Sequence, residues 1–177
     1  MKKFLKILGL IILLIIAIVL ISALFISKDY HLEREVTINA PQEKVWSHVN
    51  TLKGFQSWNP FGKEDPNVQM TYTGTDGTVG ASYTWKGNSK VGEGQQTITK
   101  IEGPDRIETK LHFIEPMDGE ATSYVQLTKE GAGTKVKWGF DSRYKYPMNF
   151  MKLFMDGMMK DKYDEGLAKL KSLSEAN

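Results

Sequence analysis

The most constraining feature of the sequence is a run of uncharged, almost wholly apolar residues from Ile7 to Ile26. In an α-helix each residue rises about 1.5 Å, so these twenty residues span about 30 Å, which matches the hydrocarbon core of a bilayer. Three lysines precede the run, at positions 2, 3 and 6. The pattern predicts an N-terminal transmembrane anchor over residues 1–27 that contacts the membrane through residues 4–26.

The flanking charges predict how this anchor is oriented. Lysines before an apolar helix favour a cytoplasmic N-terminus, which places the rest of this single-pass protein outside the cell (inner) membrane. The alternative is a cleaved signal peptide, whose apolar region usually has about 7–15 residues and ends in a small-x-small site. The run here is longer, and its exit at Ser22–Ser27 lacks such a site. An uncleaved anchor is therefore favoured over cleavage.

The rest of the chain suits one domain over residues 32–177, joined to the anchor by a short linker at 28–31. From His31 onward there are 19 basic and 20 acidic residues, so the domain itself is nearly neutral. No basic stripe is visible, and we expect no nucleic-acid partner. Cysteine is absent, which excludes disulfides and thiolate chemistry. We expect a monomeric domain.

Hydrophobic periodicity predicts the order of elements in this domain. Residues 32–38 alternate as a first strand, and a short helix follows, with Pro41 in its first turn. Glycine-punctuated alternation then predicts six strands at hairpin spacing, over 68–73, 81–85, 92–101, 106–114, 121–129 and 134–140. The start Gly92-Glu-Gly94 favours a β-bulge there. Residues 148–173 show helical spacing of apolar residues.

Six segments in this order carry a resemblance to a known superfamily: INAPQEKVWSHV, FQSWNPF, YTGTDGTVGASYTWKGN, VGEGQQTITKIEGPDRI, GTKVKWGF and YDEGLAKLKSL. From Leu32 to the C-terminus the chain resembles the helix-grip, START-like or SRPBCC superfamily, in particular its polyketide cyclase/dehydrase-like group. The resemblance implies an α+β fold in which an antiparallel, seven-stranded curved sheet surrounds a long C-terminal helix. It also implies a cavity between sheet and helix.

Residues typical of catalysis are few. No HExxH motif, metal-spaced His/Asp/Glu set or G-x-S-x-G elbow is present, so we expect no metal and no cofactor. Most carboxylates fall at turns or on polar faces. The exceptions are Glu93, between two glycines, and Asp141, after the inward-facing Phe140. With Tyr83 they are weak candidates for acid–base roles in a cyclase/dehydratase-type enzyme. The alternative is that both carboxylates simply lie at solvated strand ends.

The kinds of apolar residue in the domain favour a binding function. Strand positions of the inward parity carry large aromatic or sulfur-containing side chains, and methionine crowds the start of the last helix. Methionine is common at adaptable binding surfaces, although plain core packing is the alternative for any one residue. The predicted ligand-binding residues are Trp58, Met70, Tyr72, Tyr83, Trp85, Trp138, Phe140, Met151 and Met155. The predicted ligand is a hydrophobic or lipid-like small molecule.

The segment from Phe55 to Phe61, with three aromatic residues, has two interpretations. Phe55 and Trp58 share a face of a short helical turn, which favours a core plug or gate at the mouth of the cavity. The short link to the anchor and the preference of tryptophan for the bilayer interface allow a membrane contact instead. Three functions follow: a membrane-anchored carrier, an enzyme of the cyclase/dehydratase kind, or a scaffold with a filled core.

Overall fold

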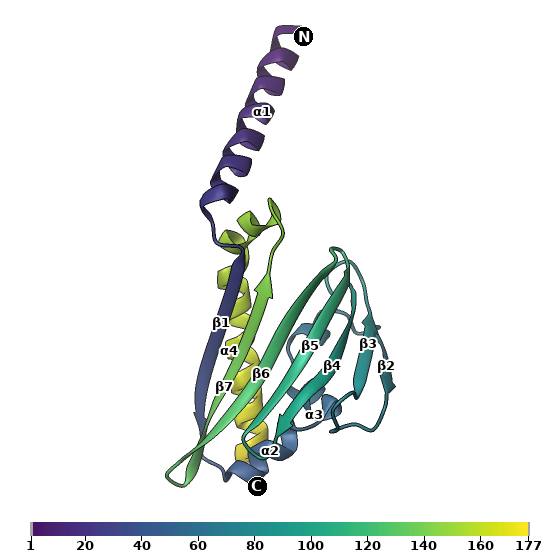
Figure 1. Cartoon of the computed structure of the whole chain (residues 1–177), viewed down its shortest axis with the longest axis vertical. Coiled ribbons are helices and arrows are strands. Elements are labelled where there is room, and N and C mark those ends of the chain that lie inside the picture. Colours follow the sequence, from purple (N-terminus) through teal and green to yellow (C-terminus); the bar gives the residue numbers. More distant parts are fainter. Residues whose placement is uncertain (1, 177) are drawn as a thin grey trace.

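The computed structural model describes residues 2–176. Helix α1 (Lys2–Phe25) projects away from the rest of the chain (Figure 1), and nearly all of its side chains are exposed. It is long and apolar enough to cross a bilayer, a criterion that a signal sequence also meets. The described helix thus agrees with the apolar run read from the sequence.

A single seven-stranded antiparallel sheet forms the centre of the domain. Its strands are β1 (Asp29–Ile38), β2 (Gln69–Thr73), β3 (Ser82–Lys86), β4 (Glu93–Glu102), β5 (Arg106–Glu115), β6 (Gly119–Glu130) and β7 (Gly133–Arg143). The spatial order is β1-β7-β6-β5-β4-β3-β2, so β2 to β7 form a meander and β1 closes it beside β7. This confirms the predicted helix-grip fold. A register shift at Glu93/Gly94 confirms the predicted bulge.

Strand β1 begins earlier than the sequence pattern indicated. Asp29, Tyr30 and His31, which were expected in the linker, pair with Arg143, Ser142 and Asp141 of β7. The Tyr30 side chain is buried, and its ring lies 6.2 Å from that of Phe140, so apolar packing extends the strand toward α1. Only a few residues therefore separate α1 from the sheet.

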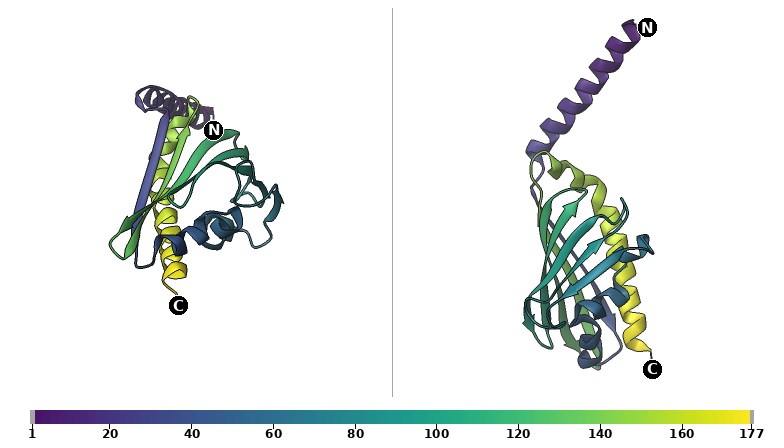
Figure 2. Two further views of the ribbon diagram at one scale, coloured as in Figure 1. Left: turned by 60° about the horizontal axis from the view of Figure 1, so that its bottom comes forward. Right: turned by 90° about the vertical axis from the view of Figure 1, so that its right-hand side faces the viewer.

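Helices cover part of the concave, inner face of the sheet. Helices α2 (Gln42–Val49) and α3 (Leu52–Trp58) and the 3-10 turn η1 (Phe61–Glu64) follow β1. After β7 come the 3-10 turn η2 (Met148–Met151) and the long helix α4 (Lys152–Glu175). Helix α4 packs along β1, and α2 and α3 lie against the far end of the sheet (Figure 2). We call the end of the sheet beside α1 the α1 end, and the opposite end the far end.

Strand register arranges the inner-face residues in rows across the sheet. The row nearest α1 contains Phe113, Gly94, Trp85 and Met70, and the next runs from Ser142 through Leu111 and Gln96 to Tyr72. A Cβ atom on Gly94 would lie 2.4 Å from Cζ2 of Trp85, so only glycine allows that indole to lie over β4. The rows toward the far end carry fully buried residues such as Val136 and Leu127.

The surroundings of two glycines in α4 show how closely the helix approaches the sheet at each position. A Cβ atom on Gly166 would lie 2.7 Å from Cζ3 of Trp138, whereas one on Gly157 would meet no atom within 4 Å. In an open helix position Gly→Ala stabilises by about 0.5–1 kcal/mol, and overpacking costs about 1–3 kcal/mol. We expect Gly157→Ala to raise the free energy of unfolding and Gly166→Ala to lower it.

Denaturant unfolding of the two variants, side by side in the same detergent, measures both effects. An equal gain in stability for both variants would contradict the close contact between α4 and Trp138.

Candidate functional site

Five aromatic side chains close the concave face from its middle toward the far end, and we call them the aromatic floor: Phe55, Trp58, Phe61, Trp138 and Tyr163. The ring of Trp138 stacks on that of Tyr163 with centroids 3.8 Å apart. Trp58 meets Trp138 edge-on at 4.8 Å and is completely buried. Trp58, Trp138 and Tyr163 are buried and Phe55 and Phe61 are half-buried, so these stacked and edge-on contacts form a well-packed part of the core.

The contacts of the aromatic floor fix the position of the Phe55–Phe61 segment. Trp58 donates from its Nε1 atom to the carbonyl of His48 at 3.1 Å, which ties α3 to α2. Its ring is inside the domain and therefore does not touch a bilayer in this structure. Ion pairs Lys63–Glu165 and Lys162–Glu64 link η1 to α4 beside it. The segment thus joins the short helices to α4 across the concave face.

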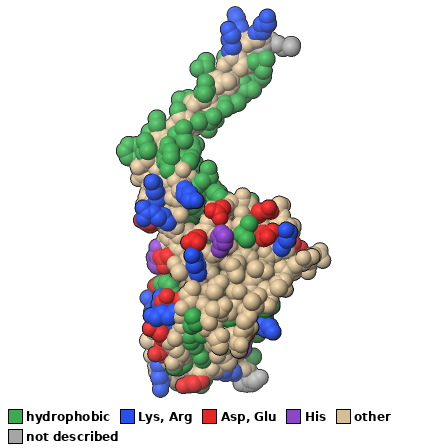
Figure 3. All heavy atoms as spheres, turned by 45° about the vertical axis from the view of Figure 1, so that its right-hand side comes forward, with side chains coloured by type: hydrophobic (Ala, Val, Ile, Leu, Met, Phe, Trp, Pro, Cys, Tyr) green, Lys and Arg blue, Asp and Glu red, His purple; other side chains and the backbone are tan. Residues whose placement is uncertain are grey.

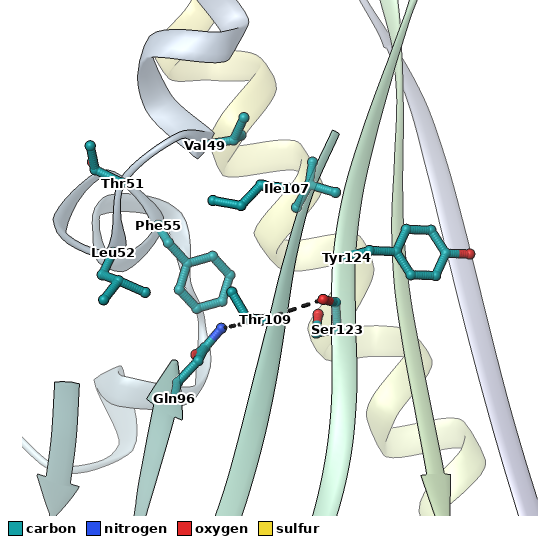
Figure 4. A pocket seen from close by; sticks show the side chains of 10 residues that line it. Val49, Thr51, Leu52, Phe55, Gln96, Ile107, Thr109, Ser123 and Tyr124 are labelled. Atoms are coloured by element: carbon teal, nitrogen blue, oxygen red, sulfur yellow. Dashed lines mark hydrogen bonds between the residues drawn. The ribbon is translucent and has the colours of Figure 1, made fainter. Parts of the chain in front are cut away.

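A small cavity remains between α2, α3 and the sheet (Figure 4). It measures about 20 Å³, and its lining includes Leu52, Phe55, Gln96, Thr109 and Ser123. A cavity of this size has room for about one water molecule, and its lining is mostly apolar. Figure 4 shows the Phe55 ring facing Gln96 and Thr109, while the Tyr124 ring points to the other face of the sheet. The far half of the concave face is therefore filled by side chains.

A row of hydrogen-bonded polar groups crosses this filled apolar interior. The Tyr83 hydroxyl donates to Oε1 of Gln96 at 2.8 Å, and Nε2 of Gln96 donates to Oγ1 of Thr109 at 2.8 Å. Next along the sheet, the Trp138 indole donates to Oγ of Ser123 at 3.0 Å. Burial raises the pKa of the Tyr83 phenol, so this hydroxyl stays protonated and acts as a donor.

One amide near this row has an unused donor. Among residues 2–176, the Nε2 atom of Gln56 is buried without a hydrogen bond of good geometry, although it lies close to the Tyr83 hydroxyl, and its Oε1 atom accepts from Asn59. A buried amide N–H without a well-formed hydrogen bond costs about 1–3 kcal/mol. The interior therefore offers neutral hydrogen-bonding groups rather than a charge.

The α1 end of the concave face is less covered, and its apolar side chains form what we call the apolar mouth. On the sheet side Met70, Leu111 and Phe113 are only half-buried. On the helix side Met151 and Met158 are 39% and 54% exposed, and Met155 is half-buried. The apolar mouth consists of Met70, Leu111, Phe113, Met151, Met155 and Met158.

The predicted ligand-binding residues fall into two groups. Met70, Met151 and Met155 belong to the apolar mouth, and Tyr72 is exposed beside it with its ring 5.7 Å from that of Tyr83. The others are buried: Trp58 and Trp138 in the aromatic floor, and Tyr83, Trp85 and Phe140 on the inner face. The first group therefore lies at a surface that a small molecule can reach. The second group is buried and packs beneath that surface.

The two candidate carboxylates do not reach the concave face. Asp141 accepts from His31 at 2.7 Å on the outer face of the sheet, and Glu93 pairs with Lys86 at 2.9 Å on that same face. Neither carboxylate therefore has the position that an acid–base role in the cavity would require, and both match the alternative of solvated, paired groups. Strand β7 continues to Arg143, so alternation turns Asp141 away from the side of Phe140.

Asp141 instead lines an open hollow of about 510 Å³ on the outer face at the α1 end. Two ion pairs, Arg143–Asp29 and Lys110–Glu120, line this hollow together with the His31–Asp141 hydrogen bond. The hollow is thus lined mainly by charged and polar groups. Such a surface does not favour an apolar guest.

Sequence reasoning missed the polar row and the unused Gln56 donor. The signal for the row was present, because Gln96, Thr109 and Ser123 occupy inward positions of strands whose other inward residues are apolar. The Gln56 environment depends on how α3 packs, and strand alternation carries no information about it.

Comparison with known proteins agrees with this architecture. The family model described as "Polyketide cyclase / dehydrase and lipid transport" matches residues 30–175. The chain therefore belongs to the polyketide cyclase/dehydrase and lipid transport family. No curated protein matches the chain in sequence.

Solved structures share the fold at low sequence identity. A protein from Nitrosospira multiformis is 19% identical with a TM-score of 0.60, over 81% of this chain and 94% of its own. The protein Ara h 8.0201 is 15% identical with a TM-score of 0.59, over 84% of this chain and 99% of its own. The di-domain ARO/CYC BexL from the BE-7585A biosynthetic pathway is 13% identical with a TM-score of 0.63, over 85% of this chain and 51% of BexL. These likenesses describe the fold.

Proposed function

We propose that this protein is a membrane-anchored binding or carrier domain, which holds a hydrophobic or lipid-like small molecule at the apolar mouth. The observation that carries the proposal is the asymmetry of the concave face. Its far half is closed by the aromatic floor, whereas the half beside α1 leaves apolar side chains uncovered on both the sheet and α4. An apolar guest that covers these side chains removes them from water, which stabilises the complex by about 25 cal/mol per Å².

The chemistry of the apolar mouth favours a flexible apolar guest. Four of its six residues are methionines, one each on β2 and η2 and two on α4, and their unbranched thioethers adapt to irregular shapes. The Gln96 side chain lies in the same row as Leu111, so a guest that reaches inward meets amide and hydroxyl groups. We therefore propose a guest with a long apolar part and a neutral polar end, such as a carbonyl or hydroxyl.

Helix α1 supplies the membrane context of the proposal. We propose that it remains as an uncleaved anchor, with Lys2, Lys3 and Lys6 on the cytoplasmic side and the domain outside the inner membrane. Helix α1 leaves the domain at the same end of the sheet that carries the apolar mouth (Figure 1), so we propose that a lipid-like guest passes directly between the bilayer and the domain.

The enzymatic alternative has little support from the geometry. Glu93 and Asp141 lie on the outer face, and the pKa of Tyr83 is raised by burial, so none of the three is placed to exchange protons with a guest at working pH. We therefore favour binding over a cyclase/dehydratase reaction.

Photo-crosslinking of the full chain in nanodiscs tests the proposal. Nanodiscs that contain a diazirine-bearing long-chain alcohol are irradiated, and the labelled peptides are mapped by mass spectrometry. We expect labels on the peptides of β2 and β5, at Met70, Leu111 and Phe113, whose side chains lie on the inner face of the sheet. Labels confined to α1 and the residues beside it would contradict a binding site on the concave face.

A further inference from the structure

The junction between α1 and the domain is built from side chains of the domain. Asn149 in η2 is completely buried, and its Nδ2 atom donates to the carbonyls of Ala23 at 2.7 Å and Ile26 at 2.8 Å. The last four carbonyls of a helix have no partner within the helix, so Asn149 supplies one of the missing donors at the end of α1.

Two further side chains hold the same junction. Lys152 donates from Nζ to the carbonyls of Ser27 at 3.1 Å and Asp29 at 2.6 Å. The Tyr146 hydroxyl donates to the carbonyl of Leu20 at 3.2 Å. Helix α1 is thus docked on η2 and the start of α4 rather than tethered by a free linker. This docking fixes which surface of the domain lies beside the membrane-spanning segment.

That surface is apolar. Leu153 and Phe154 are 61% and 72% exposed, and Tyr146 and Met148 are 43% and 40% exposed. We call these four residues the apolar lip. The Phe154 ring makes an edge-on contact with that of Phe150 at 5.5 Å and projects from the first turn of α4. Exposed apolar side chains gathered in one place mark an interaction surface.

Three observations point to a lipid bilayer as the partner of the apolar lip. The lip is continuous with α1, whose apolar surface runs onto this end of the domain (Figure 3). Tyr146 has the amphipathic ring that is typical of the bilayer interface. Lys145 precedes it in the sequence with its side chain 86% exposed, and a lysine beside an apolar surface reaches toward lipid phosphates.

We propose that the apolar lip inserts into the interfacial layer of the bilayer that α1 spans, and so holds the apolar mouth against the lipid surface. This inference rests on the proposed membrane anchorage. It adds a second, independent contact with the same bilayer and gives the domain a defined tilt. Leu153 and Phe154 enter the acyl boundary, while the junction at Asn149 lies at headgroup depth.

The absence of cysteine from the sequence allows a direct depth measurement. Single cysteines are introduced at Phe154 (Phe154→Cys), at the exposed Lys169 of α4 (Lys169→Cys) and at Ile15 of α1 (Ile15→Cys). Each full-length variant is nitroxide-labelled and reconstituted in vesicles of phosphatidylcholine with one part in four phosphatidylglycerol. Power saturation with oxygen and with a water-soluble nickel chelate then reports the depth of each label. Circular dichroism confirms that each variant is folded.

We expect the label at position 154 to be accessible to oxygen and shielded from nickel, the label at 15 to lie deeper, and the label at 169 to be nickel-accessible. If the labels at positions 154 and 169 are equally accessible to nickel while the label at position 15 lies in the bilayer, the contact of the apolar lip is overturned and the membrane anchor is retained. A label at 154 shielded from both reagents indicates a protein partner or a second copy and also overturns it. Nickel access at 15 overturns the anchorage itself and the lip with it.

Discussion

Replacing Trp138 by alanine is expected to lower the free energy of unfolding by about 3–5 kcal/mol, the usual cost of truncating a buried tryptophan. The indole is 2% exposed, stacks on Tyr163 at 3.8 Å and donates to Ser123. Its loss leaves a cavity beneath α4 and a hydroxyl without its donor. Domains of this size have a total stability of about 5–15 kcal/mol, so the variant is expected to be only marginally folded.

Trp46→Ala is the matched control, because it removes the same indole from a half-buried position that packs on Gly103. Because this substitution removes less buried apolar area, we expect it to lower the free energy of unfolding by less than about 2 kcal/mol. Guanidinium unfolding of the full chain in detergent, followed by near-ultraviolet circular dichroism, measures both variants. Similar costs for the two would show that the aromatic floor is not the packed centre of the domain.

Met158→Glu is expected to reduce crosslinking of the long-chain alcohol to the β2 and β5 peptides by at least about tenfold, because an apolar guest must then desolvate a carboxylate. Met158 is 54% exposed, so the substitution leaves the core and the stability of the domain nearly unchanged. This separates an effect on binding from an effect on folding.

Ser172→Glu is the control for the added charge, since Ser172 is exposed near the end of α4, far from the apolar mouth. We expect its crosslinking yield to equal that of the unmodified chain. A Met158→Glu yield equal to that of Ser172→Glu would place the guest elsewhere than between α4 and the sheet.

The fold was predictable because local patterns determine it. Period-two alternation assigned inward faces correctly, as for Trp138 and Phe140 on β7, and glycine turns separated the strands of the meander. Helical spacing located α4. The same alternation, carried to the end of β7, places Asp141 on the outer face. The error was to treat this residue as a strand end rather than as part of the strand.

The site was less predictable because it depends on tertiary distances. Trp58 packs against Trp138 and closes the far half of the concave face. No local sequence pattern predicts this contact, because the two residues are eighty positions apart. The α1 junction likewise joins Ala23 to Asn149, 126 positions away. Methionines at the start of α4 were predicted to face a ligand, but the sequence could not tell the apolar mouth from the apolar lip.

The central claim is that the inner face is accessible at the α1 end and closed at the far end. Its most direct test compares the thiol reactivity of Leu111→Cys in the apolar mouth with that of Leu127→Cys, whose native side chain is 1% exposed in the far half. The account predicts that N-ethylmaleimide modifies Cys at position 111 at least about tenfold faster in the folded, full-length protein, because position 127 requires local opening. Equal, slow modification at both positions would mean that the concave face is filled throughout and would contradict the account.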